Sequence, residues 1–375
     1  MRTTKLGRYA QSQGTEAAYA GRMRTSTDPS SATGDRYRQF AEVEARGMSP
    51  CYEDWAREVA GDAVVVALID RLPPVKRQPN LVFSSARFLG APVSPYSEFA
   101  GWLVEHWAMV EAVALTHATQ TNEAGRCAAL LPALAEIAGP SREGRGGPLA
   151  LIEVGASAGL CLHPDRYSYR YAGAFGERML HPADGPSQVV LDCAVSGPVP
   201  IPERMPEVVW RAGIDLNPLD LNRPADVDWL HALIWPEHDD RRARLRSAVA
   251  IARRHPVAIV RGDLTEQIEA LVSRARSQVS PDTTIVVFHT AVLLYLDEAT
   301  KQAFTAQMHR LPVRWLSNEG QGVVPGVKEQ LSLRGSPRTP AESSAFILAL
   351  DADPIAYTQP HGRSIRWLDP AAPAA

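Results

Sequence analysis

The sequence predicts an α/β protein: a Rossmann-like, doubly wound and mostly parallel sheet that follows an all-helical N-terminal subdomain. Over the C-terminal two-thirds of the chain, short apolar runs alternate with amphipathic helical stretches, as expected of βαβ units. The first of these runs ends in a turn of small residues over 153–159, the place where such a sheet meets a nucleotide cofactor. Over 35–140 the apolar residues recur instead at helical spacing.

Composition narrows the class of protein before any motif is considered. The 375 residues, 45% of them hydrophobic, suffice for about two domains with buried cores. The net charge of -3 predicts no basic face, so no nucleic-acid partner is expected. No run of about 18 apolar residues and no signal peptide are found, so we expect a cytoplasmic protein without a membrane partner. The four cysteines lack the spacing of a zinc site or a disulfide framework, and no metal is expected.

The N-terminal part divides into a tail and a helical subdomain. Residues 1–34 are rich in Ser, Thr and Gly, and we predict a disordered tail. In the helical subdomain, over 35–140, apolar positions such as Trp55 and Val59 follow helical spacing, and proline pairs separate the helices. The Gly-rich, charged stretch over 139–148 is expected to link this subdomain to the sheet.

The Rossmann-like cofactor domain is expected over 149–370. Its predicted parallel strands are the apolar runs at 149–154, 208–216, 257–260, 284–289 and 313–316. Alternating tyrosines at 167, 169 and 171 predict a β-ribbon inserted at about 163–207. Three later runs with no helices between them predict an antiparallel hairpin at the sheet edge; they lie at 329–333, 345–350 and 365–367.

The turn after the first strand carries the strongest functional signal. An acid, Glu153, ends the strand, and Gly155, Ala156, Ser157 and Gly159 follow it. Glycines at such a turn let backbone N–H groups approach a ligand. The pattern is not G-x-G-x-x-G, so a dinucleotide is not favoured. Acid-x-Gly-x-x-x-Gly resembles motif I of S-adenosylmethionine-dependent methyltransferases, and this resemblance implies that these five residues bind that cofactor. The alternative is an ordinary strand-to-helix turn.

Two further acids end the next two strands. Asp215, with Asn217 after it, is placed to accept hydrogen bonds from ribose hydroxyls, although its distance from the glycine turn exceeds the usual spacing of about 20 residues. Asp263 and Leu264 end the third strand, where methyltransferases bind the adenine ring. The alternatives are caps: Asp215 for its own turn, and Asp263 for a helix, with Glu266 completing a capping box.

The fourth and fifth strands supply the candidate catalytic residues. His289 ends the fourth strand and could act as a general base near neutral pH. Tyr295 follows it, and Glu319 ends the fifth strand as a base or a substrate anchor. Many methyltransferases carry Asp or Asn where His289 stands. The alternative for His289 is a histidine hydrogen-bonded within its loop.

Over 36–368 the chain resembles a bacterial, largely actinobacterial family called DUF2332, which has no established activity. The resemblance rests on Ser49-Pro50 with Tyr52, Arg77 with Pro79-Asn80-Leu81, Glu153 to Leu160, Asp165 to Tyr169, Gly213 to Pro218, Trp235-Pro236-Glu237 and Val287-Phe288-His289. The family's motif I is usually followed by Asn-Leu, whereas Cys161-Leu162 stands here. The resemblance implies a substrate clamp formed by Arg166, Tyr167, Trp235, Glu237, Arg77 and Asn80. For the aromatic residues, packing is the alternative.

These patterns leave four functions open. The first is an S-adenosylmethionine-dependent methyltransferase that acts on a small-molecule substrate. The second is an enzyme with the same fold and cofactor, or another nucleotide, that catalyses a cyclisation, an elimination or an aminocarboxypropyl transfer. The third is a non-catalytic binding protein. The fourth is a serine hydrolase, because residues 155–159 also satisfy G-x-S-x-G with Ser157 as nucleophile. The sequence leaves the oligomeric state undetermined.

Overall fold

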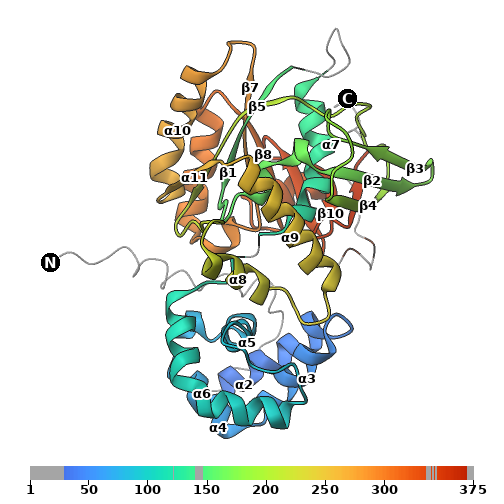
Figure 1. The fold of residues 1–375 in the computed structure, drawn as a ribbon. Helices are drawn as coiled ribbons and strands as arrows, with labels where there is room; N and C mark the ends of the chain where they lie inside the picture. Colours follow the sequence, from blue (N-terminus) through green and yellow to red (C-terminus); the bar gives the residue numbers. More distant parts are fainter. Residues whose placement is uncertain are drawn as a thin grey trace, which may run out of the picture. The chain divides into compact units, whose positions relative to one another are not determined.

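The computed structural model describes residues 29–120, 122–139, 147–334, 339, 342 and 344–369 (Figure 1). The predicted tail at 1–34 lies mostly outside this part of the chain. Its last residues belong to a helix, because α2 spans Pro29–Phe40. Most of the predicted linker at 139–148 also lies outside the described residues.

The described residues form two compact units. One unit comprises Asn122–Leu219 and the chain from Arg246 onward, and the other comprises the chain up to residue 120 together with Asp220–Leu245. The boundary near 121 differs from the expected one at 140. The helix between these two positions, α7 (Cys127–Ala138), is almost entirely buried and contacts the strands of the sheet, which explains why it belongs to the sheet unit.

The helical unit is built around stacked aromatic rings. Trp55 lies parallel to Phe99 with ring centroids 3.6 Å apart, and Phe83 meets both rings edge-on. Ser49 and Asp62 cap the helices that follow them by accepting backbone N–H bonds. The elements are α2, the π-helical turn η2 (Ala41–Ala45), α3 (Pro50–Val59), α4 (Ala63–Ile69), η3 (Pro74–Lys76), α5 (Pro79–Phe88), α6 (Tyr96–Thr116), α8 (Pro224–Ala232) and the first part of α9 (Asp239–Arg254).

The other unit is a mixed α/β structure around one open, mostly parallel sheet, as the sequence predicts. Its eleven strands lie in the order β3-β2-β4-β11-β10-β9-β8-β7-β1-β5-β6. The five predicted strands are confirmed as β1 (Leu149–Val154), β5 (Val208–Asp215), β6 (Ala258–Arg261), β7 (Thr284–Thr290) and β8 (Arg314–Gly320). All neighbours among these five pair in parallel.

Helices cover both faces of this sheet. On the face that carries Ile152 and Val287, the core includes α10 (Leu264–Gln278), α11 (Glu298–Arg310) and α12 (Val327–Leu333). Helix α7 covers the opposite face, where Tyr171 donates its hydroxyl to the carbonyl of Ala128. Figure 1 shows α10 and α11 on one side of the strands and α7 on the other. We call these two faces the α10 face and the α7 face.

The inserted ribbon extends this same sheet. The insertion at 163–207 supplies β2 (Ser168–Gly173), β3 (Gly176–Leu180) and β4 (Val190–Ser196). Strand β4 pairs in parallel with β11 (Ser364–Trp367), which carries the three strands to the far end of the sheet. The antiparallel hairpin was predicted at the edge of the sheet, and this position is wrong. Strands β9 (Phe346–Leu350), β10 (Asp353–Thr358) and β11 lie inside the sheet.

One predicted strand is wrong. Residues 329–333 belong to α12, which begins after Gly326, a residue with φ +81°, and buries Val327 and Leu331 at helical spacing. None of the helices in the described ranges combines the length and the apolar character needed to cross a bilayer.

Candidate functional site

The turn after β1 lies where the chain reverses its direction of travel across the sheet. After the inserted strands β2 to β4, the chain forms β5 and β6 on one side of β1 and then returns to the other side of β1 for β7. Ligands of open α/β sheets bind outside the carboxyl ends of the strands at such a point. Gly155, Ser157 and Gly159 have φ values of +69°, +51° and +73°. Serine rarely adopts this backbone conformation, which is typical of functional turns.

Asp215 reaches into this turn from the end of β5. Its Oδ2 accepts the backbone N–H of Ser157 at 2.8 Å, and its Oδ1 accepts that of Asn217 at 2.7 Å. The sheet therefore brings two predicted cofactor positions into direct contact. The carboxylate organises both turns, as the capping alternative requires.

Close packing explains the glycines of the turn. A Cβ on Gly155 would lie 2.4 Å from a methyl of Val292, and one on Gly159 would lie 3.1 Å from Val257. Ala156 is fully buried. Instead of the expected α-helix, two 3₁₀ turns follow, η5 (Leu160–Leu162) and η6 (Pro164–Arg166). The turn thus has no long helix whose N-terminus could bind phosphate.

Asn122 clamps the turn from the segment before α7, and sequence reasoning missed it. Its Nδ2 donates to the carbonyl of Ala156 at 3.1 Å, and its Oδ1 accepts the N–H of Leu160 at 2.9 Å. An asparagine outside any strand pattern gives no signal of this role, because its partners lie more than 30 positions away.

A buried polar cluster lies beside the turn on the α7 face. Arg126, which ends η4 (Ala124–Arg126), donates to the carbonyl and the hydroxyl of Thr290, both at 3.0 Å. Next to Thr290, Asn318 accepts the hydroxyl of Thr358 at 2.6 Å. In the described part of the chain, Oε2 of Glu153 and Nδ2 of Asn318 have no hydrogen-bond partner. Unsatisfied buried atoms of this kind are often found at functional sites.

Glu153 is 2% exposed, and burial is the main reason that its pKa lies well above the usual value; Cys161 and Asp215 also raise it, while Arg126 lowers it. Above the ordinary carboxyl pKa the unfolded chain releases this proton and the folded chain keeps it. The stability of the sheet unit should therefore fall as pH rises from about 4.5 towards the folded pKa, by at most about 1.4 kcal/mol per pH unit.

Glu153→Gln should remove this pH dependence. We expect the variant to gain stability relative to the wild type between pH 5 and pH 8, as measured by denaturant unfolding at both pH values. Glu203→Gln, which changes an exposed carboxylate before β5, should follow the wild type. Equal pH dependence in wild type and Glu153→Gln would contradict the burial of an uncompensated carboxyl.

His289 and Glu319 lie on the α10 face, across the sheet from Glu153. Trp315 Nε1 donates to His289 Nε2 at 3.0 Å, so Nδ1 carries the proton and donates to Glu319 Oε1 at 2.7 Å. The same oxygen accepts the backbone N–H groups of Val292 and Leu293. His289 has no exposed surface. Side chains of β8 engage both of its ring nitrogens, an arrangement that neither the general-base prediction nor the loop alternative describes.

The other predicted residues at this edge serve local structure. Asp263 caps α10 by accepting the N–H and the hydroxyl of Thr265, as the capping alternative proposes, and Leu264 is buried in the core. Asn217 accepts a hydrogen bond from Arg261. Tyr295 is 44% exposed in η7 (Leu293–Tyr295), beyond the loop that Glu319 holds.

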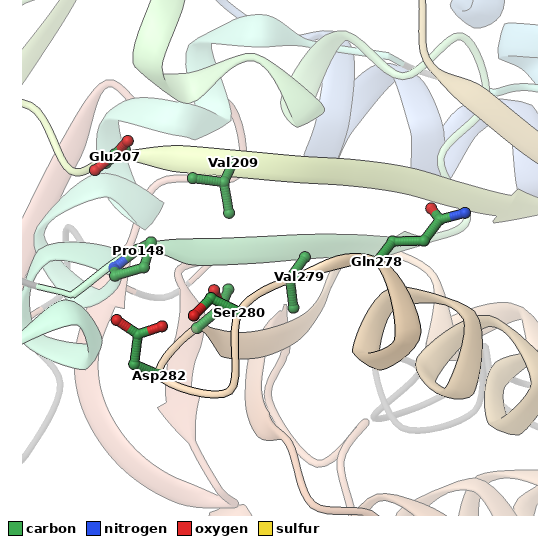
Figure 2. A pocket seen from close by; sticks show the side chains of 8 residues that line it. Pro148, Glu207, Val209, Gln278, Val279, Ser280 and Asp282 are labelled. Carbon is green, nitrogen blue, oxygen red and sulfur yellow. The ribbon is translucent and has the colours of Figure 1, made fainter.

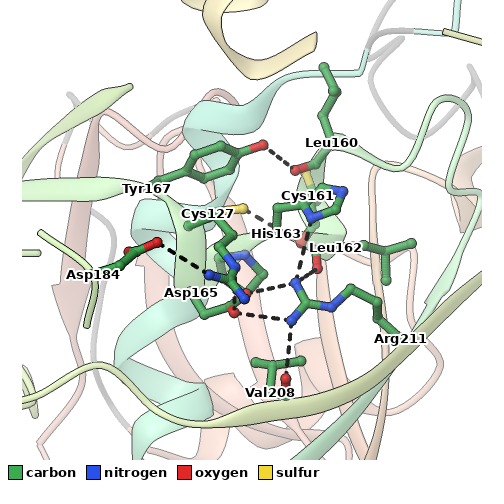
Figure 3. A network of polar contacts seen from close by, with 12 residues as sticks. Cys127, Leu160, Cys161, Leu162, His163, Asp165, Tyr167, Asp184, Val208 and Arg211 are labelled. Carbon is green, nitrogen blue, oxygen red and sulfur yellow. Dashed lines mark hydrogen bonds and ion pairs between the residues drawn. The ribbon is translucent and has the colours of Figure 1, made fainter. Parts of the chain in front are cut away.

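Arg166 and Tyr167 belong to a network that fixes the chain after the turn (Figure 3). Tyr167 is buried and donates its hydroxyl to the carbonyl of Leu160 at 2.7 Å, which supports the packing alternative. Arg166 lies 3.3 Å from Asp165 and 3.6 Å from Asp184. Asp165 is held more firmly by Arg211 of β5, through two bonds of 2.7 and 3.0 Å.

Breaking the Arg211–Asp165 pair should destabilise the sheet unit. Both side chains are less than 15% exposed, so removal of one leaves a charge that is poorly solvated. We expect Arg211→Leu and Asp165→Leu each to cost roughly 2–4 kcal/mol in the free energy of unfolding, and the double variant to cost less than the sum. Chemical denaturation of the four proteins measures this. Strict additivity would contradict a direct coupling.

The remaining predicted substrate residues lie in the helical unit and contact one another there. Trp235 Nε1 donates to Oδ1 of Asn80 at 2.8 Å. Glu237 accepts the hydroxyl of Ser49 at 2.6 Å and the N–H of Cys51 at 2.8 Å, so it caps α3. The guanidinium of Arg77 is bonded to Asp70 and to the carbonyl of Leu72. These contacts give each residue a role within the helical unit.

The hydrolase alternative gains no support from this geometry. Ser157 is 4% exposed, and its hydroxyl has no hydrogen-bond partner among the described residues. A nucleophilic serine needs a base within hydrogen-bond reach. His289, the general base predicted from the sequence, is engaged by Trp315 and Glu319 instead.

A comparison with protein families matches residues 34–367 to a model described as "Uncharacterized protein conserved in bacteria (DUF2332)". No curated protein and no solved structure matches the chain.

Proposed function

The chain belongs to the DUF2332 family, which assigns no activity, and from its sheet edge we propose that it is an S-adenosylmethionine-dependent enzyme. The proposed reaction is methyl transfer to a small molecule. The observation that carries the proposal is the 2.8 Å bond from the backbone N–H of Ser157 to the carboxylate of Asp215. It joins the turn after β1 to the acid that ends β5, the two positions that frame an adenosine in Rossmann-like folds.

The order of the strands also supports the likeness to nucleotide-binding sheets. Numbered along the chain, the five parallel strands β1, β5, β6, β7 and β8 lie in the order 3-2-1-4-5, which is shared by doubly wound nucleotide-binding sheets. The antiparallel strand β9 follows β8, so the likeness is limited to this half of the sheet.

The character of the turn favours this cofactor over a dinucleotide. A pyrophosphate is normally bound at the N-terminus of an α-helix, and here 3₁₀ turns follow β1. S-adenosylmethionine has no phosphate and carries a positive sulfonium. Asp215 presents a carboxylate at this edge, which suits a cationic cofactor better than an anionic one.

When bound, the cofactor would supply an electrophilic methyl group. Asp215 would hold the ribose, and the backbone of residues 155–159 would lie against the nucleoside. With His289 and Glu319 engaged in the core, the chain would contribute mainly by holding the reactants close together and excluding water. Non-methylating chemistry would use the same residues, and product mass distinguishes the two: methylation adds one CH₂ unit.

Calorimetric titration tests the binding step without knowledge of the substrate. We expect saturable binding of S-adenosylmethionine and of S-adenosylhomocysteine, and much weaker binding of NAD. No heat at millimolar S-adenosylmethionine would overturn the proposal. Binding without turnover of any substrate would favour the non-catalytic alternative.

A further inference from the structure

A pocket lies at the amino ends of β1, β5 and β7, at the opposite end of the strands from the proposed cofactor turn. It has a volume of about 290 Å³. Three of its lining residues immediately precede these strands: Pro148, Glu207 and Thr283. Figure 2 shows the carboxylates of Glu207 and Asp282 near Pro148, at one end of the pocket. This site is separate from the proposed cofactor turn, which follows the carboxyl end of β1.

The charges around the pocket favour a cation. Glu207 and Asp282 provide two carboxylates, and no lysine or arginine is found among the described residues that line the pocket. Arg276 lies nearby and donates to the carbonyl of Thr283 at 3.1 Å. Counting it, these side chains carry one net negative charge.

The C-terminal end of a helix adds to the negative electrostatic potential at the pocket. Helix α10 has 15 residues and ends at Gln278, which lines the pocket with Val279 and Ser280. The last carbonyls of a helix have no partner within the helix, and its C-terminus carries about half a negative charge. The helix end and the two carboxylates therefore act in the same direction.

Two further features indicate an organic ligand. Thr283 is 3% exposed and lines the pocket, and its hydroxyl has no hydrogen-bond partner among the described residues. Val209, which is 47% exposed, and Val279 give the pocket apolar walls (Figure 2). Apolar walls do not suit a bare metal ion. Nor do the described residues include any group of three or more His, Cys, Asp or Glu side chains that could hold one.

We propose that the pocket lined by Glu207, Asp282 and Thr283 at the end of α10 binds a small organic monocation of the alkylammonium class. The ammonium lies between the two carboxylates, and the alkyl part lies against Val209 and Val279. This inference does not depend on the proposed function.

Titration of n-butylammonium chloride into the full-length protein, followed by ligand-observed saturation-transfer NMR at constant ionic strength, tests the proposal. We expect saturable binding in the millimolar range, and binding of neutral n-butanol at least about tenfold weaker. Glu207→Gln with Asp282→Asn should weaken n-butylammonium binding by at least about tenfold, because both charges that face the ligand are lost.

Matched variants separate binding from folding. Thr283→Val keeps the shape of a buried side chain and should weaken binding about threefold through the lost hydroxyl. Glu203→Gln, an exposed carboxylate outside the pocket, should bind like the wild type. The proposal is overturned by unsaturable binding, by equal affinity for n-butanol, or by wild-type affinity in the double carboxylate variant. Calcium binding without n-butylammonium binding would also overturn it.

Discussion

Replacing Asp215 by alanine should weaken the binding of S-adenosylmethionine by about 100-fold or more. Two charge-assisted hydrogen bonds to ribose hydroxyls, at about 1.5–3 kcal/mol each, account for at least that loss. The substitution also removes the acceptor for the Ser157 amide, so the turn that faces the nucleoside loses its anchor. Calorimetric titration of variant and wild type measures the change in Kd.

A cap of equal type provides the control. Asp297 is the N-cap of α11 and accepts the N–H of Thr300 at 2.7 Å. Asp297→Ala should cost about 1 kcal/mol of stability and leave the Kd for the cofactor within about twofold. If Asp215→Ala and Asp297→Ala changed the affinity equally, Asp215 would be a cap and nothing more.

Replacing Glu319 by alanine should lower the free energy of unfolding by roughly 4 kcal/mol, because three N–H groups, two of them buried and one partly buried, lose their shared acceptor. These groups belong to His289, Val292 and Leu293. Val292 in this loop also packs against Gly155, so the substitution should loosen the packing beneath the turn after β1. Denaturant unfolding followed by circular dichroism measures the loss.

Two further variants serve as comparisons for Glu319→Ala. Glu319→Gln keeps the shape and one acceptor oxygen, so it should cost less than the alanine variant and remain folded. Glu298→Ala removes an exposed carboxylate from the first turn of α11 and should cost less than about 1 kcal/mol. A cost for Glu319→Ala no larger than that for Glu298→Ala would mean that the buried dyad does not stabilise the fold.

The sequence predicts the strands best where both faces are buried. Strand β1 is buried at every position, so it appears as an unbroken apolar run and its predicted bounds match the observed ones. Strand β10 was missed because it begins with Asp353-Pro354, a pair that is unfavourable for strands. The pairing of β4 with β11 joins residues about 170 positions apart, and no local pattern specifies it.

Some residues of the candidate site could be placed from the sequence, and others could not. Asp215 was placed beside the turn because neighbouring parallel strands share one edge. His289 was predicted as a catalytic residue and Glu153 as a cofactor-binding residue, yet Glu153 pairs with Phe288, so the next residue, His289, points to the other face. Arg126 and Asn122 could not be predicted, because tertiary contacts with distant residues determine their roles.

A co-crystal structure with S-adenosylhomocysteine tests the central claim most directly. The account predicts that both ribose hydroxyls lie within hydrogen-bond distance of the Asp215 carboxylate and that the nucleoside lies against the backbone of residues 155–159. Ligand density at any other place, or clear density for this turn without ligand at saturating concentration, would contradict it.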